Sequence, residues 1–228
     1  MYEIILGRNE SDRKKLGLKG TIFLGKHYVT MEKERALANP IYLDVNKPHV
    51  ILISGKRGSG KSYSEGVIAE GIANLPRDIS ENLTTFIFDT MGIYWTMKYP
   101  NYRDDKLLQE WKLKPASLDP KIYVPKGLFA EYKEKGIPVD RAFAIKPCEI
   151  DVEEWCEIFQ IDLLSPEGLL FDSILEEARK PKMSIQNLLD KLKESKDNEA
   201  KILINRLKAA NKWGIFDYKA EPFEELIK

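Results

Sequence analysis

The eight residues GKRGSGKS, Gly55 to Ser62, follow directly after the apolar run VILI and constrain the fold more than any other stretch. They match the pattern G-x-x-x-x-G-K-[ST], with Gly55, Gly60, Lys61 and Ser62 at the defined positions. Glycines let the backbone curve so that several amide N–H groups point into one concave nest. That nest and the positive end of the following helix attract phosphate oxygens. The stretch therefore predicts a phosphate-binding loop between a strand and a helix, and with it nucleotide binding.

The predicted loop assigns separate roles to its side chains. Lys61 is expected to reach the β and γ phosphates and is the predicted catalytic residue, while the Ser62 hydroxyl completes the coordination of a magnesium ion. ATP and Mg²⁺ are the predicted cofactors. An ordinary glycine turn with an exposed lysine is the alternative, but it explains neither the apolar strand before the loop nor the amphipathic helix after it. The predicted nucleotide-binding residues are Gly55, Lys56, Arg57, Gly58, Ser59, Gly60, Lys61, Ser62 and Tyr63.

The periodicity around the loop predicts an α/β fold. Apolar or small positions after Ser62 recur at helical spacing and predict a helix that ends before Pro76. TTFIFD, Thr84 to Asp89, predicts a second buried strand, and KIYVP, Lys121 to Pro125, predicts a third. Strand, helix and strand in this order predict a parallel sheet with right-handed crossovers, flanked by helices.

The segments on either side of this core differ from it. Residues 1–46 predict a short antiparallel β appendage, because β-like runs alternate there with polar turns. The runs are EIIL, TIFLG, HYVTM and IYLDV, and the turns are GRNESDRKK and KERALANP. Residues 47–150 are the predicted nucleotide-binding core, and residues 151–228 are a predicted helical region.

Several helix signals mark the last region. Asp151, followed by Glu154, resembles a capping box, and Ser165 and Ser184 stand at positions that favour helix starts. Apolar residues at helical spacing up to Ala210 predict a last helix.

Composition excludes some classes of protein. Lys and Arg number 36, as do Asp and Glu, so no global positive field indicates nucleic-acid binding, although a local basic surface is compatible with this balance. Two cysteines, Cys148 and Cys156, and two histidines, His27 and His49, are too few and too scattered for a zinc site, so free thiols are expected. No apolar run could cross a bilayer, and the first residues lack a signal-peptide pattern. We therefore expect a cytoplasmic protein with no membrane association.

The residues around the loop resemble the HerA-like ATPases of the HerA and FtsK group. In that family a strand with an L-D turn leads to H-x-x-I-x-G-x-x-G-S-G-K-S, and the next helix ends in E-G, here Glu70-Gly71. A further strand closes on an aspartate followed by M-G or a similar pair, here Asp89. The resemblance covers residues 20–125 well and the helical remainder weakly. The matching stretches are NPIYLDVNKPHVILISGKRGSGKSYSEGVIAEGI, FIFDTMGIYWTMKYPN and KIYVPKG.

The resemblance implies a RecA-like core that assembles into a hexameric ring and uses ATP to move along double-stranded DNA. It also implies a nuclease partner in the processing of DNA ends, and a β segment that is a shortened form of the family's N-terminal barrel. No DNA-contacting residue carries over, because no match is specific enough to name one.

One part of the expected machinery is missing. A translocating ATPase needs a Walker B strand, four apolar residues followed by Asp-Glu, to order magnesium and polarise the attacking water. TTFIFDT is the only candidate, and there Asp89 is followed by Thr90. Asp89 is therefore expected to be a magnesium ligand, to serve the site in another way, or to cap the strand end. Arg57, Arg141 and Arg179 are candidate arginine fingers, with a surface charge as the simpler interpretation of each.

Two other functions remain open. One is a regulatory or scaffolding module that binds nucleotide without efficient hydrolysis, and the other is a small-molecule or nucleotide kinase. A kinase requires an acceptor pocket and an arginine-rich lid, and neither is identifiable here. We expect the chain to be an N-terminal portion of a longer ATPase, or a short relative that binds nucleotide with little turnover.

Overall fold

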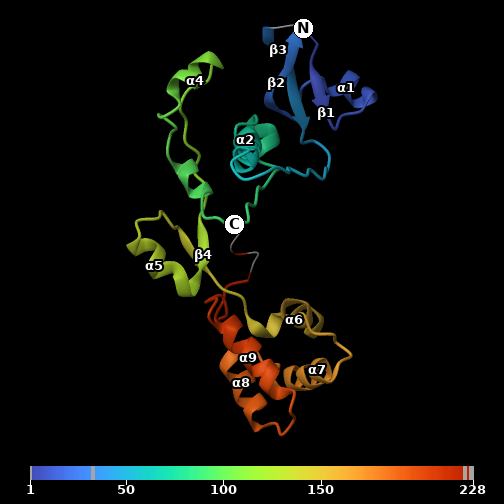
Figure 1. Cartoon of the computed structure of the whole chain (residues 1–228), viewed down its shortest axis with the longest axis vertical. Helices are drawn as coiled ribbons and strands as arrows, with labels where there is room; N and C mark the ends of the chain where they lie inside the picture. Colours follow the sequence, from blue (N-terminus) through green and yellow to red (C-terminus); the bar gives the residue numbers. More distant parts are fainter. Residues whose placement is uncertain (1, 32–33, 223–224, 226–228) are drawn as a thin grey trace. The chain divides into compact units, whose positions relative to one another are not determined.

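The computed structural model describes residues 2–31, 34–222 and 225 (Figure 1). The chain divides into two compact units, residues 1–119 and residues 120–228. The first unit contains the glycine-rich loop, and the second contains a bundle of helices. No helix within the described ranges is both long enough and apolar enough to cross a membrane.

The first unit begins with a three-stranded sheet in the order β1-β3-β2. Strand β2 (Thr21–Met31) runs antiparallel to β3 (Glu34–Asp44), whereas β1 (Ile4–Leu6) runs parallel to β3. The β-like runs recognised in the sequence lie in these three strands. The predicted antiparallel arrangement is correct for β2 and β3 only. The chain reverses between β1 and β2 and again between β2 and β3, so β3, which pairs with β1, runs in the same direction as β1.

Both polar segments that were predicted as turns contain regular structure. Helix α1 (Glu10–Leu16) lies in the first, where the Asn9 side chain accepts a hydrogen bond from the Asp12 amide over 2.8 Å and caps the helix. Most of the second lies in β3, where Ala36 pairs with Val29 of β2. These predictions were wrong because an N-cap starts a helix in a polar stretch, and pairing with a neighbouring strand overrides local composition.

Helix α2 (Lys61–Ala73) follows the loop and confirms the predicted helix. It packs against β2, and Gly71 approaches Ile22 so closely that a Cβ at position 71 would lie 2.8 Å from the Ile22 Cβ. Gly71, part of the E-G pair noted in the sequence, thus allows this close packing. The remaining elements of the unit are short: α3 (Arg77–Ser80), η1 (Tyr94–Lys98) and α4 (Asp105–Glu110).

The first two strands of the predicted parallel sheet are extended segments that belong to neither described sheet. They are residues 50–53 and 84–89, and side chains such as Val50 and Phe88 are almost fully exposed. An extended segment joins a sheet only when neighbouring strands accept its backbone hydrogen bonds. Among the described residues no such strand lies beside either segment, so the predicted parallel sheet is not formed around the loop.

The third predicted strand does form, in the second unit. Strand β4 (Tyr123–Pro125) pairs in parallel with β5 (Arg141–Phe143). The connection contains η2 (Lys126–Leu128) and helix α5 (Phe129–Glu134), so the pair has the helical crossover that parallel strands require.

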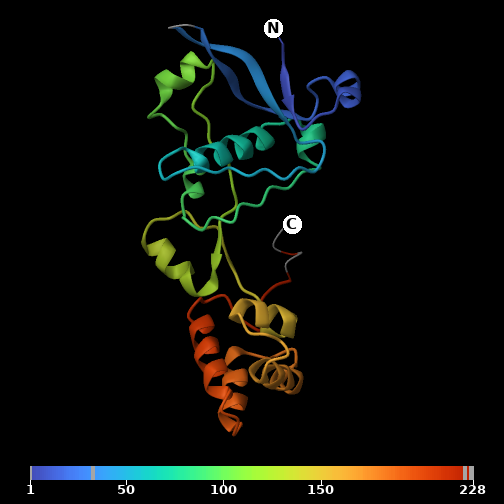
Figure 2. The same ribbon diagram turned by 45° about the vertical axis from the view of Figure 1, so that its right-hand side comes forward.

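Four helices follow the short turn η3 (Pro147–Glu149) and form a bundle (Figures 1 and 2). Its centre is apolar, with Trp155, Phe171, Leu188, Leu203 and Leu207 all fully buried. The helices are α6 (Val152–Phe159), α7 (Pro166–Ala178), α8 (Ile185–Glu194) and α9 (Ala200–Asn211).

The predicted helix starts in this bundle are confirmed. Asp151 and Glu154 form a capping box at α6. The Ser165 hydroxyl accepts a hydrogen bond from the Gly168 amide over 3.1 Å, and the Ser184 hydroxyl accepts one from the Asn187 amide over 3.2 Å. Each cap satisfies amide groups that the first turn of a helix leaves without partners.

Candidate functional site

The glycine-rich loop, residues 55–60, curves tightly before α2. Gly58 and Gly60 have φ angles of 78° and 87°, in the left-handed region that favours glycine. At Gly55 an added Cβ would lie only 2.4 Å from the Ser59 Oγ. The backbone path therefore favours glycine at positions 58 and 60, whereas at position 55 the Ser59 side chain would have to move to admit a Cβ.

Amide groups at the end of the loop remain available to a ligand. Helical hydrogen bonding starts at Ser64, whose amide donates to the Gly60 carbonyl oxygen over 2.9 Å. Within the described part of the chain, the amides of Lys61, Ser62 and Tyr63 donate to no acceptor. The first turn of a helix leaves such N–H groups free and carries a partial positive charge. This end of α2 therefore fits a phosphate group.

The Lys61 side chain folds back onto the loop. Its Nζ donates hydrogen bonds to the carbonyl oxygens of Gly55, over 2.9 Å, and Lys56, over 3.2 Å. These contacts hold the ammonium group at the loop, where it adds a full positive charge to the partial charge of the helix end. The structure thus brings the loop residues and Lys61 together as the motif predicts.

Asp89 lies where the extended segment 84–89 ends. Its Oδ2 atom accepts hydrogen bonds from the amides of Ile93, over 2.7 Å, and Tyr94, over 2.8 Å, and so caps the turn η1. Its Oδ1 atom is buried and, among the described residues, has no hydrogen-bond partner. The carboxylate therefore acts as a cap with one oxygen and keeps the other for a further partner. A role in magnesium binding stays a prediction.

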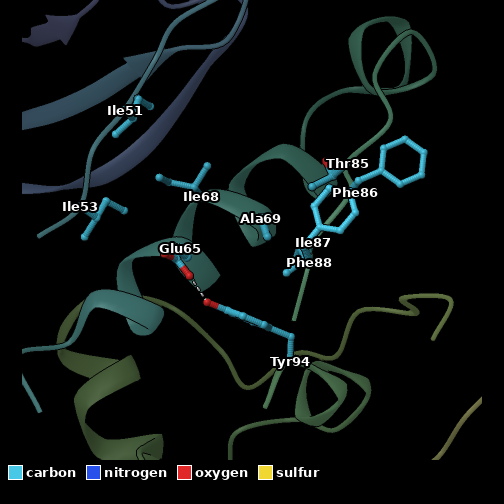
Figure 3. A pocket seen from close by; sticks show the side chains of 10 residues that line it. All are labelled: Ile51, Ile53, Glu65, Ile68, Ala69, Thr85, Phe86, Ile87, Phe88 and Tyr94. Carbon is cyan, nitrogen blue, oxygen red and sulfur yellow. Dashed lines mark hydrogen bonds between the residues drawn. The ribbon is translucent and has the colours of Figure 1, made fainter. Parts of the chain in front are cut away.

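Tyr94 connects this turn with α2 and is the residue that sequence reasoning missed (Figure 3). Its hydroxyl donates a hydrogen bond to the Glu65 carboxylate and also lies 3.3 Å from the Ser62 carbonyl oxygen. Burial raises the pKa of Tyr94, and the hydrogen bond to Glu65 raises it further, so the hydroxyl remains a donor. The only sequence signal for Tyr94 was its position five residues after Asp89. That spacing does not predict a particular contact.

An apolar pocket of about 390 Å³ lies beside α2, between it and the two extended segments (Figure 3). None of its lining residues comes from the loop, so this pocket is distinct from the free amides at the start of α2. Most of its lining side chains are aliphatic or aromatic, and its polar groups are the Glu65 carboxylate and the hydroxyls of Thr85 and Tyr94. The α2 side contributes Ile68 and Ala69, and the segments contribute Ile51, Ile53 and Phe86 to Phe88.

The three arginines considered as fingers lie in different places. Arg57 is exposed in the loop and Arg141 is exposed in β5. Arg179 pairs with Asp151 over 3.0 Å and donates to the Ile150 carbonyl oxygen over 3.3 Å, which links the end of α7 to the start of α6. That contact gives Arg179 a structural role in the bundle.

The cysteines and other ionisable residues do not add a second site. Cys148 and Cys156 are free thiols. Across residues 2–31, 34–222 and 225, no group of three or more His, Cys, Asp or Glu side chains is arranged to hold a metal ion.

Comparison with known proteins identifies the family. Residues 22–224 match the family model described as helicase HerA, central domain. The match spans the loop, α2, Asp89 and most of the second unit. No curated protein and no solved structure matches the chain.

Proposed function

The chain belongs to the HerA helicase central-domain family, and we propose that it binds ATP with Mg²⁺ and uses hydrolysis to drive movement along double-stranded DNA. The observation that carries this proposal is the loop at residues 55–60. Its carbonyl oxygens hold the Lys61 ammonium group, and the first turn of α2, which follows it directly, has free amides. An ATPase of the HerA and FtsK type needs this arrangement to hold a triphosphate.

The residues of the loop divide the work of holding ATP. The amides of Lys61, Ser62 and Tyr63 would bind phosphate oxygens, and the Lys61 side chain would balance charge on the β and γ phosphates. The Ser62 hydroxyl would hold Mg²⁺, and the unpartnered Oδ1 of Asp89 is the second group proposed for this ion. Bound Mg²⁺ would neutralise the charge that develops during phosphoryl transfer.

We further propose that residues 50–53 and 84–88 are strands of a RecA-like parallel sheet that has additional strands beside them. The exposed apolar side chains of both segments support this, since a parallel sheet in an α/β protein is buried on both faces. The apolar pocket next to α2 supports it too, because sheet residues would fill that space. Such strands would also bring the Asp-Glu pair that hydrolysis requires.

The assembly that we propose is a hexameric ring in the cytoplasm, working on DNA ends with a nuclease partner. Family membership supports this proposal, and no DNA-contacting residue is assigned. Ring formation would place several loops around one DNA duplex, so that hydrolysis in successive copies moves the DNA.

Binding of a fluorescent ATP analogue with Mg²⁺ tests the nucleotide site. Lys61→Ala is expected to weaken binding at least tenfold, because it removes the charge facing the phosphates. Lys106→Ala, on the exposed face of α4 in the same unit, is the matched control and should bind like the wild type. Hydrolysis by residues 1–228 alone is expected to be very slow. Rapid turnover that Lys61→Ala leaves unchanged would contradict the proposal.

A regulatory or scaffolding module that binds nucleotide is the second candidate. The printed sequence favours it in one respect, because Asp89 is followed by Thr90 and no Asp-Glu pair occurs anywhere. Native mass measurement with and without ATP, together with hydrolysis assays on duplex DNA, separates the two functions. A ring whose hydrolysis responds to duplex DNA supports the translocase, and a monomer that is indifferent to DNA supports the module.

A further inference from the structure

Three of the four helices in the bundle of the second unit each carry charges of a single sign, whereas α8 carries both signs. From Ile150 to Ala178, which includes α6 and α7, every charged residue is acidic. From Ala200 to Phe216, which includes α9, every charged residue is basic. Neither stretch contributes a residue to the proposed nucleotide site, so nucleotide binding does not explain why their charges have opposite signs.

The acidic side includes exposed apolar residues where α6 turns into α7. Ser165 caps α7, so Leu164 and Leu169 occupy the two positions that pack together in a hydrophobic staple. Here they are 79% and 55% exposed, which leaves an apolar surface among acids. We call this surface the α6–α7 corner, made of Glu157, Ile158, Asp162, Leu164, Glu167 and Leu169.

The carboxylates on this side of the bundle concentrate negative charge. Burial raises the pKa of the Cys156 thiol, and the negative charges of Asp172, Glu153 and Asp162 raise it further. Among the residues that the structure describes, Glu157, Asp162 and Glu167 have no ion pair. The charge of the corner is therefore not balanced within the bundle.

The basic surface follows one exposed side of α9. Lys201, Lys208 and Lys212 are spaced by seven and four residues, so they share a side of the helix, and all three are exposed. Trp213, 44% exposed, and Ile202, exposed to the same extent, add apolar area next to them. We call this surface the α9 face, made of Lys201, Ile202, Arg206, Lys208, Lys212 and Trp213.

The cations of the α9 face lack partners within the bundle. In the described ranges, none of its three lysines forms an ion pair, and the opposite side of α9 is buried through Leu203 and Leu207. In both views α9 lies on the other side of the bundle from the loop that joins α6 to α7 (Figures 1 and 2). The two surfaces therefore cannot meet within one molecule.

We propose that the α6–α7 corner of one copy binds the α9 face of a second copy. Each surface combines exposed apolar side chains with charges of a single sign, and the two signs are opposite. Contact would bury the leucines against Ile202 and Trp213. The opposite charges would align the two copies, and repulsion between like charges would prevent two corners or two α9 faces from pairing. Two different surfaces of the same chain form a head-to-tail interface, which repeats into a closed ring or an open filament.

Duplex DNA is the competing occupant of the α9 face. Lysines along a helix suit phosphates, but DNA gives no reason for the exposed leucines and acids of the corner. A second copy accounts for both surfaces at once. The proposal depends only on the second unit and stands apart from nucleotide binding.

Sedimentation velocity of the full chain, without nucleotide or DNA, tests this interface. We expect self-association at tens of micromolar in 50 mM NaCl, and much less in 500 mM NaCl because salt screens the charges. Lys201→Glu/Lys208→Glu and Glu157→Lys/Glu167→Lys should each weaken association at least tenfold. An equimolar mixture of these two variants should associate again, since each then offers charges that the other lacks.

Lys180→Glu/Lys182→Glu is the matched control. It makes the same change in net charge as Lys201→Glu/Lys208→Glu but in the turn between α7 and α8, outside both surfaces, and should associate like the wild type. Circular dichroism verifies that every variant keeps its helices. A wild-type chain that stays monomeric in 50 mM NaCl would overturn the proposal. The proposal would also be overturned if both charge-reversal variants associated as strongly as the control. The same holds if Lys201→Glu/Lys208→Glu lost duplex DNA binding but kept its self-association.

Discussion

The Tyr94 hydroxyl oxygen lies 3.3 Å from the carbonyl oxygen of Ser62, the residue predicted to hold magnesium. The same hydroxyl donates to Glu65 one turn further along α2, and the Tyr94 amide donates to Asp89. One side chain therefore ties the end of the segment 84–89 to the first turn of α2. A displacement of the segment 84–89 would therefore be transmitted to the first turn of α2, and the reverse.

Tyr94→Phe should weaken Mg²⁺–ATP binding about two- to tenfold. The variant keeps the ring but loses the hydroxyl, whose hydrogen bonding is worth about 0.5–1.5 kcal/mol. Titration with a fluorescent ATP analogue measures the change. Tyr102→Phe removes an exposed hydroxyl from the same unit and is the control. Equal affinity of the two variants would mean that Tyr94 does not position Ser62.

Asp89→Asn separates the two roles proposed for Asp89. Asparagine can still accept hydrogen bonds from the amides of Ile93 and Tyr94, so the variant should fold with nearly unchanged stability. If Oδ1 serves Mg²⁺, the magnesium concentration for half-maximal ATP binding should rise several-fold. Asp89→Ala should in addition lower the free energy of unfolding by about 1 kcal/mol, because it removes the cap. A normal magnesium titration for Asp89→Asn would leave the cap as its only role.

Gly71→Ala should destabilise the first unit. The new Cβ would lie 2.8 Å from the Ile22 Cβ, a rigid branch point close to the backbone. Overpacking of this kind costs about 1–3 kcal/mol, more than the roughly 1 kcal/mol that alanine gains over glycine in a helix. Urea unfolding measures the difference.

Gly66→Ala is the matched control for that experiment. Position 66 lies in the same helix, and its nearest neighbour is the flexible end of Met97, at 3.3 Å. This variant should be at least as stable as the wild type, because alanine favours the helix and the methionine can move. Similar destabilisation by both variants would show that contact with Ile22 is not the cause.

The ion pair between Arg8 and Asp44 should make the first unit sensitive to acid. The two groups lie 2.6 Å apart with both side chains buried. Burial alone would raise the pKa of Asp44, but hydrogen bonds from Arg8 and the Asn46 amide outweigh it and lower the pKa. The folded state therefore favours the carboxylate. The stabilisation is complete above the unfolded pKa, about 4, and is lost as the pH falls through the lowered folded pKa.

Urea unfolding between pH 7 and pH 3 checks this expectation. Asp44→Ala should cost about 3–5 kcal/mol at pH 7, because it leaves the Arg8 charge buried without its partner. The variant should also lose part of the wild-type decline in stability below pH 4. Asp78→Ala removes one member of an exposed pair with Lys19 and should change neither quantity appreciably. An unchanged acid profile in Asp44→Ala would contradict the assignment.

Local signals predicted much of this protein from sequence. The loop, α2 and the helix starts at Asp151, Ser165 and Ser184 were predicted correctly. In each case residues within one or two turns of the helix supply the whole cause, through glycine conformations and side-chain caps. Family membership also followed from the residues around the loop.

Interactions between residues far apart in the chain could not be predicted from the sequence. The link from Tyr94 to Glu65 spans 29 positions, and the ion pair from Arg8 to Asp44 spans 36. Neither leaves a periodic pattern, because each depends on how separate elements pack. The same holds for the polar segment that became part of β3, since its partner strand, and not its composition, decides its conformation.

The sequence by itself determined that this chain has a glycine-rich loop before a helix, because the motif is a local constraint on backbone conformation. Only the tertiary structure decided that Tyr94 ties Asp89 to that helix, and that α9 lies on the other side of the bundle from the loop that joins α6 to α7. Those relationships arise when helices and strands pack, and packing joins residues that the sequence keeps apart.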